Sequence, residues 1–164
     1  MRRVLGKVWI SLALVVLLTA GCDRGTRPGN IGKPAPQFVL SDGTQTVDLR
    51  KLRGHVVVLN LWATFCVPCV EELPSLLALH QQMPDLAIVA VSMDQDPDVY
   101  HRFLIKHHVD LLTFRDEDQR INALYGTEQI PETYVIDRQG VLRRKFVSSQ
   151  DWTSPEITSY LSKL

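Results

Sequence analysis

The feature that most constrains this chain is a pair of cysteines, Cys66 and Cys69, placed just after a strongly apolar run. The run covers residues 56–62 and predicts a strand that is buried on both faces. A helix is expected to begin at the cysteines. Pro68 fits its first turn, because the N–H groups there have no partner within the helix and the N–H that proline lacks is not needed. Free N–H groups and the positive end of the helix dipole lower the pKa of the first thiol. The arrangement predicts a redox-active dithiol, with Cys66 as the attacking thiolate.

The same spacing also occurs in zinc sites, which require a second pair of ligands. Cys22 is the only other cysteine, and the five histidines show no paired spacing next to a second Cys-x-x-Cys. His107 and His108 are neighbours, but adjacent residues of a helix point in different directions and do not easily share an ion. The redox interpretation is therefore favoured, and we expect neither a metal nor another cofactor.

Charge and length narrow the remaining classes of protein. The 164 residues carry 18 basic and 18 acidic side chains, mixed along the sequence. No basic patch is interleaved with aromatic residues, so nucleic-acid binding is not expected. The length fits one domain with an appendage, and we expect a monomer.

The first 22 residues have the pattern of an export signal and are not expected to belong to the fold. Positive charges at Arg2, Arg3 and Lys7 precede an apolar stretch over residues 8–18, which is too short to span a bilayer comfortably. We predict a secretion signal over residues 1–22.

The end of this segment, Leu18-Thr19-Ala20-Gly21-Cys22, resembles a bacterial lipobox, in which cleavage leaves an acylated cysteine. The alternative is an ordinary signal peptide that leaves a free cysteine in an oxidising compartment. Lipidation accounts for the odd number of cysteines and is favoured. Asp23 resembles the inner-membrane retention signal of enterobacterial lipoproteins. We expect lipid on Cys22 and a location on the bacterial cytoplasmic membrane, with the domain facing the periplasm.

After the signal, the pattern predicts a tether and one α/β domain. Residues 23–36 are polar and rich in glycine and proline, which is typical of a flexible tether. The domain, residues 37–164, is expected to open with a β-hairpin around Asp42-Gly43. Strands alternating with helices and closing on an antiparallel hairpin predict a three-layer α/β/α domain with a mixed central sheet. The expected strands cover residues 55–62, 86–93, 111–114, 133–137 and 141–147, and the expected helices cover 66–83, 99–107, 119–125 and 154–164.

Three motifs together resemble the thioredoxin superfamily, specifically its membrane-tethered TlpA/ResA and CcmG/DsbE branch. Residues 62–69, Trp-Ala-Thr-Phe-Cys-Val-Pro-Cys, are similar to the active-site run of that family. Pro74 matches the proline that kinks the active-site helix, and residues 130–137 resemble the cis-proline loop and its following strand. The resemblance extends from about Gly32 to the end of the chain and implies a thioredoxin fold.

The resemblance also implies roles for individual residues. Cys66 and Cys69 would form the redox-active disulfide, and a cis peptide bond would place Ile130 and Pro131 beside them, where a backbone edge binds substrate. The residues expected to pack around the site are Trp62, Phe65 and Pro68.

A carboxylate one helical turn after the second cysteine is the candidate proton acceptor. Asn60 stands where thioredoxin has a buried aspartate, so that acceptor is absent, whereas Glu72 lies three residues after Cys69 on the same helix face. In the TlpA/ResA branch, a glutamate at this position is partly buried and serves the second cysteine. The alternative is an exposed carboxylate, which is the usual state of glutamate and the expected state of Glu71.

These features predict a membrane-anchored thiol–disulfide oxidoreductase that acts as a reductant of secreted dithiol proteins such as apocytochrome c, converting their disulfides back to dithiols with electrons from a membrane thiol-reducing donor. A thiol peroxidase is one alternative, because residues 34–38 resemble the opening of the redoxin group. Thr64, however, lies two residues before the cysteine, whereas peroxidatic sites have a threonine three before it. A non-catalytic or copper-delivering lipoprotein is the other alternative. Copper delivery would want extra Met or His beside the cysteines, and none is adjacent.

Overall fold

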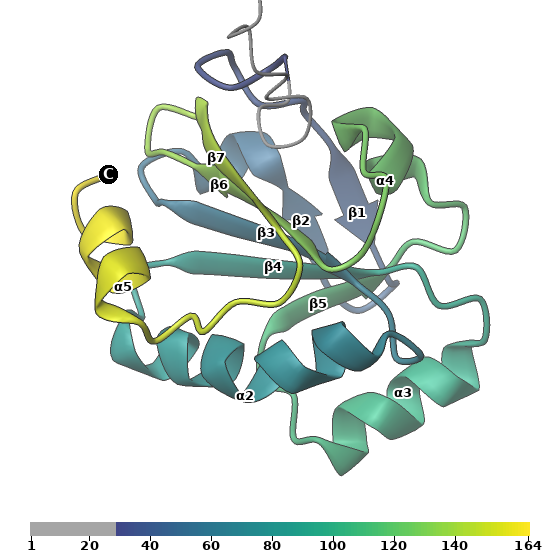
Figure 1. Ribbon diagram of the computed structural model, residues 1–164. Helices are drawn as coiled ribbons and strands as arrows, with labels where there is room; N and C mark the ends of the chain where they lie inside the picture. Colours follow the sequence, from purple (N-terminus) through teal and green to yellow (C-terminus); the bar gives the residue numbers. More distant parts are fainter. Residues whose placement is uncertain (1–28) are drawn as a thin grey trace, which may run out of the picture.

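The computed structural model describes residues 29–164, whose arrangement is shown in Figure 1. The predicted signal peptide, the predicted lipid-attachment residue Cys22 and the first part of the predicted tether lie outside the described residues. Within residues 29–164, no helix is long and apolar enough to cross a membrane.

A mixed five-stranded sheet forms the middle layer, in the order β5-β4-β3-β6-β7. The central strand β3 (Val57–Trp62) runs parallel to β4 (Ala87–Ser92), which in turn runs parallel to β5 (Leu112–Arg115). β6 (Glu132–Ile136) lies antiparallel to β3 and to β7 (Leu142–Val147). Every residue of β3 is buried, because layers cover both faces of the sheet. The predicted mixed sheet is confirmed.

Helices cover one face of the sheet (Figure 1). α2 (Val67–Gln82) and α5 (Pro155–Leu161) pack on this face through one apolar cluster, in which Trp152 is fully buried. α3 (Pro97–Lys106) packs against Trp62 in the cluster that contains both cysteines. The start of α2 therefore lies where β3, α2 and α3 meet.

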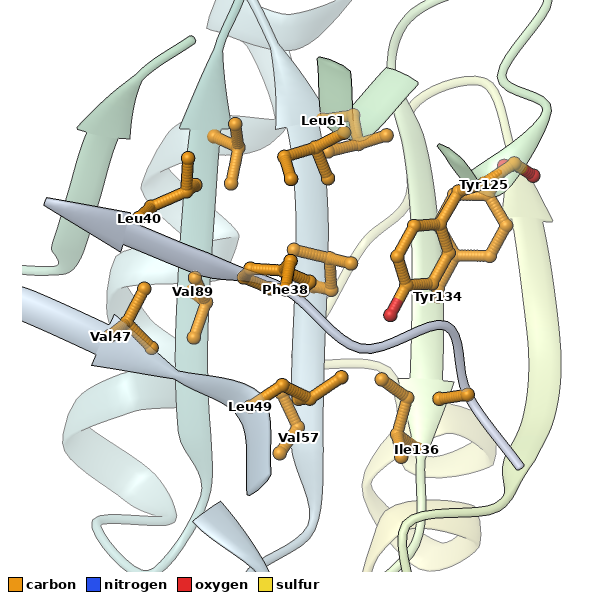
Figure 2. Packing of buried hydrophobic residues seen from close by; sticks show 14 of the residues in the cluster. Phe38, Leu40, Val47, Leu49, Val57, Leu61, Val89, Tyr125, Tyr134 and Ile136 are labelled. Carbon is orange, nitrogen blue, oxygen red and sulfur yellow. The ribbon is translucent and has the colours of Figure 1, made fainter. Parts of the chain in front are cut away.

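The opposite face is covered by a two-stranded sheet, β1 (Val39–Ser41) and β2 (Thr46–Asp48), together with α4 (Arg120–Tyr125). Figure 2 shows how the hairpin side chains fill this layer. The residues that meet there are Phe38, Leu40, Val47, Leu49, Val57, Leu61, Val89, Tyr125, Tyr134 and Ile136. The three-layer arrangement is confirmed, with a hairpin and a short helix as the third layer.

The predicted Asp-Gly turn joins β1 to β2. The Asp42 side chain accepts the backbone N–H groups of Thr44 and Gln45, and Gly43 adopts a φ of +88°, which a glycine tolerates without a Cβ clash. β2 ends at Asp48, because its carboxylate accepts the Arg50 N–H and caps a short 3₁₀ helix, Leu49–Leu52. The predicted hairpin is confirmed.

The segment expected to be a tether up to residue 36 joins the domain earlier than predicted. Gly32 N–H donates to the Leu142 carbonyl at 2.7 Å, and Ala35 N–H donates to the Gly140 carbonyl at 2.9 Å. The Ala35 side chain is buried in the hairpin-side cluster. Proline and glycine are also compatible with a chain that runs along a sheet edge, so composition alone did not reveal this contact.

Candidate active site

Cys66 and Cys69 are joined by a disulfide at the amino end of α2, with Cα atoms 5.3 Å apart. The helix begins at Val67, one residue later than predicted, because Cys66 is its N-cap. The Cys69 N–H points at Cys66 Sγ at 3.3 Å. After reduction, this N–H and the helix dipole stabilise a thiolate on Cys66. Cys66 is 8% exposed and Cys69 3%, so the first cysteine is also the more accessible.

The three residues predicted to pack around the disulfide differ in burial. Trp62 is buried, whereas Phe65 is 69% exposed and Pro68 is also exposed. Phe65 and Pro68 therefore lie on the exposed side of the disulfide, and only Trp62 lies on its buried side. The two cysteines turn inward at a spacing of three, which leaves Pro68 on the outer side of the first turn. Phe65 lies in the loop before the helix and forms an exposed apolar rim.

Trp62 forms the floor of the site. Its ring lies against Tyr100 and Phe103, with ring centroids 6.2 Å and 5.3 Å away, and all three belong to the cluster that surrounds the cysteines. Such apolar surroundings disfavour a negative charge on the inner sulfur. Cys69 therefore needs a nearby proton acceptor to become a nucleophile.

A buried aspartate that the sequence analysis did not single out holds the loop before the cysteines. Asp94 is 3% exposed and accepts the Thr64 N–H at 3.0 Å and the Thr64 hydroxyl at 2.6 Å. The Ser92 hydroxyl donates to the same carboxylate at 2.5 Å. Asp94 lies two residues after the end of the buried strand β4, and the carboxyl ends of neighbouring parallel strands meet at one edge of a sheet. The position of Asp94 just after a buried strand is the sequence feature that could have identified it as a residue near the site.

Glu72 is buried, with 3% of its surface exposed, which excludes the alternative of a solvated side chain. Asn60 Nδ2 donates to Glu72 Oε1 at 2.8 Å, and the Gln150 N–H and Trp152 Nε1–H donate to Oε2 at 3.0 Å and 3.2 Å. Burial raises the pKa of Glu72, while these three hydrogen bonds act in the opposite direction. Glu71 is exposed, as expected. The result is a buried acid with an elevated pKa one turn after Cys69.

The predicted proline loop lies beside the disulfide. The Ile130–Pro131 peptide bond is cis, and Ile130 packs against the cluster that contains both cysteines. The Pro131 carbonyl accepts the Ser148 N–H at 3.0 Å and is therefore occupied. Within residues 29–164, the backbone of Ile130 makes no hydrogen bond. The backbone of Ile130 therefore remains available for pairing with an extended segment.

Glu132, next in the chain, has a different partner. It is 2% exposed, pairs with Lys145 Nζ at 2.7 Å and accepts the Tyr134 hydroxyl at 2.8 Å. Its charge is therefore neutralised within the sheet by β7.

An open cavity of about 350 Å³ lies between Phe65, in the loop before the cysteines, and the proline loop at Ile130. Phe65, Met93 and Ile130 supply apolar walls, and Asn122, Thr127, Glu128 and two glutamines supply polar ones. The cavity joins the exposed rim of the active-site loop to the proline loop, so an extended chain beside Ile130 can place a side chain in it.

The described residues hold no arrangement suited to a metal ion. No group of three His, Cys, Asp or Glu side chains within residues 29–164 is placed to bind one. His107 instead stacks on Phe103, with ring centroids 4.1 Å apart.

Comparisons with known proteins agree with this geometry. Residues 31–145 match the AhpC/TSA family. The chain is 29% identical over 137 residues to the thiol-disulfide oxidoreductase ResA of Bacillus thuringiensis (strain Al Hakam), covering 82% of this chain and 78% of that protein. It is 35% identical over 124 residues to the thiol:disulfide interchange protein DsbE of Pseudomonas fluorescens biotype C, covering 74% and 68%.

Solved structures agree as well. A crystal structure from Chlorobium tepidum described as a thiol:disulfide interchange protein DsbE has a TM-score of 0.71 at 27% identity, covering 81% of this chain and 93% of that one. StoA from Bacillus subtilis has a TM-score of 0.66 at 18% identity, covering 80% and 98%, and supports the fold. With its Cys66–Cys69 disulfide at the start of α2, the chain belongs to the AhpC/TSA family and is a thiol–disulfide oxidoreductase of the ResA/DsbE type.

Proposed function

We propose that this chain is a membrane-anchored reductant of disulfides in exported proteins, with the dithiol of apocytochrome c as the client class. The similarity to ResA and DsbE supports the exchange chemistry, and the lipobox-like residues 18–22 support the anchor. Electrons arrive from a thiol-reducing donor in the membrane. The observation that carries the proposal is the buried Glu72 carboxylate one turn after Cys69, since it suits proton transfer at the resolving thiol.

The reaction begins at Cys66. Its thiolate attacks one sulfur of the client disulfide, and the other client sulfur leaves as a thiolate, which gives a mixed disulfide. Cys69 then loses its proton and attacks Cys66 Sγ, so the second client sulfur leaves. The client gains two electrons and becomes a dithiol, and Cys66 and Cys69 return to the disulfide seen in the structure.

Glu72 accepts the proton of Cys69 in this scheme. A general base works best when its pKa lies near the operating pH, and burial raises the pKa of Glu72 in that direction. Oε2 already accepts two N–H donors, whereas Oε1 accepts one from Asn60. Oε1 is therefore the oxygen with room for the proton.

The direction of electron flow is tested by the reduction potential of the Cys66–Cys69 pair, measured by equilibration with glutathione. A reductant should have a potential near that of thioredoxin, about −270 mV. A potential near that of a strong periplasmic oxidant, about −120 mV, would overturn the proposal and reverse the direction.

A peroxidase role receives less support from the site. The Thr64 hydroxyl donates to the Asp94 carboxylate and is not directed to a substrate. Consumption of hydrogen peroxide by the reduced protein, at a rate exceeding that with a disulfide peptide, would restore this alternative.

A further inference from the structure

The connection between β7 and α5 contacts the buried acid of the active site. Trp152 is fully buried in this connection, and its indole N–H donates to Glu72 Oε2 at 3.2 Å. The backbone N–H of Gln150 donates to the same oxygen at 3.0 Å. One carboxylate oxygen is therefore held by two donors from a segment that the reaction scheme above does not use.

The position of the indole is determined by the chain around it. The Ser75 hydroxyl on α2 accepts the Trp152 backbone N–H at 3.1 Å and lies 3.2 Å from the Gln150 carbonyl. The Phe146 ring packs edge-on against the indole, with centroids 5.3 Å apart. The indole N–H thus has little freedom to leave the carboxylate.

The groups that face Glu72 offer donors but no cation. β3 contributes the Asn60 amide, which also donates to Thr133 on β6, and the β7–α5 connection contributes two N–H groups. On α2, the titratable neighbours are Cys69 one turn earlier and Glu71. Glu71 and Asp151, both exposed, line an open cavity of about 390 Å³ that Glu72 also reaches. No ion pair to Glu72 exists within residues 29–164.

Without a cation, N–H donors are what offsets the cost of a buried carboxylate. An amide or indole N–H can donate a hydrogen bond but cannot accept one from a protonated carboxyl group. These donors therefore favour the ionised form of Glu72 over the protonated form. Among residues 29–164, Trp152 is the one side-chain donor on Oε2. Removing it leaves the Gln150 N–H on that oxygen and makes the carboxylate harder to keep ionised.

We propose that Trp152 is a positioning residue for proton transfer, whose indole N–H holds Glu72 Oε2 and keeps Oε1 as the oxygen that receives the Cys69 proton. The inference rests on the proposed role of Glu72 in resolving the mixed disulfide. Trp152 touches neither client nor sulfur in this role and acts through Glu72.

The test is the pH dependence of mixed-disulfide resolution in Trp152→Phe, measured by stopped flow with the full-length protein and a disulfide peptide. Phenylalanine keeps an aromatic ring and removes the donor. A hydrogen bond to a charged group is strong enough to move the acid limb of the profile upward by about one pH unit. Below that limb, resolution should slow about tenfold, while attack by Cys66 keeps its rate.

Two further variants separate the donor from packing. Phe146→Leu loosens the contact on the indole but keeps the N–H, so its acid limb should coincide with that of the parent. In a Glu72→Gln background, Trp152→Phe should cause no additional shift. Two results would assign Trp152 a packing role only. One is an acid limb that shifts as far in Phe146→Leu as in Trp152→Phe, and the other is a further change in the pH profile when Trp152→Phe is added to Glu72→Gln.

A spectroscopic measurement on the unmodified chain does not depend on how the variants fold. In the oxidised protein the cysteines do not titrate, so the indole N–H resonance of Trp152 should move with pH as Glu72 gains a proton. The Trp62 indole is an internal reference, since its buried N–H has no partner within residues 29–164. A chemical shift of the Trp152 indole N–H that does not change with pH overturns the inference. Disulfide exchange that is absent in the parent overturns the proposed function instead.

Discussion

Asn60 on β3 donates its amide to Glu72 on α2 at 2.8 Å, across the interface between the central strand and the active-site helix. The second amide hydrogen reaches the Thr133 hydroxyl at 2.9 Å. Asn60, which stands where thioredoxin has a buried aspartate, therefore donates a hydrogen bond to Glu72, the buried acid of this site. An aspartate at position 60 would place two buried carboxylates together, which is unfavourable unless one is protonated.

The first prediction concerns stability as a function of pH in Glu72→Gln. Burial raises the pKa of Glu72 above its unfolded value, so its contribution to stability is complete below the unfolded pKa and is lost as pH rises through the folded pKa. The variant does not titrate at this position. From about pH 4 upward, the stability of the variant relative to the parent should therefore rise with pH.

Urea unfolding of oxidised parent and variant across this range provides the measurement. Glu71→Gln, at the exposed neighbouring position, is the matched control. Its free energy of unfolding should differ from that of the parent by a constant amount across the pH range. A difference between Glu72→Gln and the parent that stays constant with pH would mean that Glu72 is not destabilised by burial.

The second prediction separates the two cysteines. Cys66→Ser should abolish disulfide exchange, whereas Cys69→Ser should accumulate mixed disulfides through Cys66, because the resolving thiol is missing. The N–H of Cys69 directed at Cys66 Sγ makes Cys66 the faster thiol in alkylation of the reduced protein at neutral pH. Faster alkylation of Cys69 would reverse the assigned roles.

The third prediction concerns the loop before the cysteines. Thr64→Val keeps the side-chain volume but removes the hydroxyl that donates to buried Asp94 at 2.6 Å. Leaving a buried carboxylate with one donor fewer should cost about 1–3 kcal/mol of stability and slow the alkylation of Cys66. Urea unfolding and alkylation rates provide the two readouts.

Thr44→Val is the matched control for this variant. Its hydroxyl donates to Asp42 at 2.7 Å in the exposed hairpin turn, so the same substitution removes the same kind of hydrogen bond where water can replace it. The change in stability should stay within about 0.5 kcal/mol, and Cys66 should react as in the parent. Equal costs at the two threonines would show that Asp94 does not hold the active-site loop.

The fourth prediction tests the anchor. Cys22→Ser should release the protein from the membrane fraction, since a lipoprotein with several acyl chains is held stably and a chain without them is not. Thr19→Leu, which brings residues 18–22 closer to the common lipobox, should leave the protein in the membrane fraction. Recovery of the parent in the soluble periplasmic fraction would contradict lipid attachment at Cys22.

The elements around the cysteines could be predicted because their signals are local. The apolar residues of β3, the Cys-Val-Pro-Cys start of α2 and the Asp42-Gly43 turn each lie within a few positions of the structure that they specify. Burial could not be predicted residue by residue in the same way. Phe65 is apolar yet 69% exposed, and Glu72 is charged yet 3% exposed, because each depends on what the rest of the chain packs against it.

The reactive groups of the site could be predicted from local sequence: a dithiol at a helix start, a proline loop and an acid one helical turn after the second cysteine. The groups that surround them depend on how distant parts of the chain pack together. Trp152 and Glu72 are separated by 80 positions, and Thr64 and Asp94 by 30, yet each pair forms a hydrogen bond to a buried carboxylate. Periodicity shows which face of an element is buried, but the path of β4, β7 and α5 through space determines which donors reach a buried carboxylate.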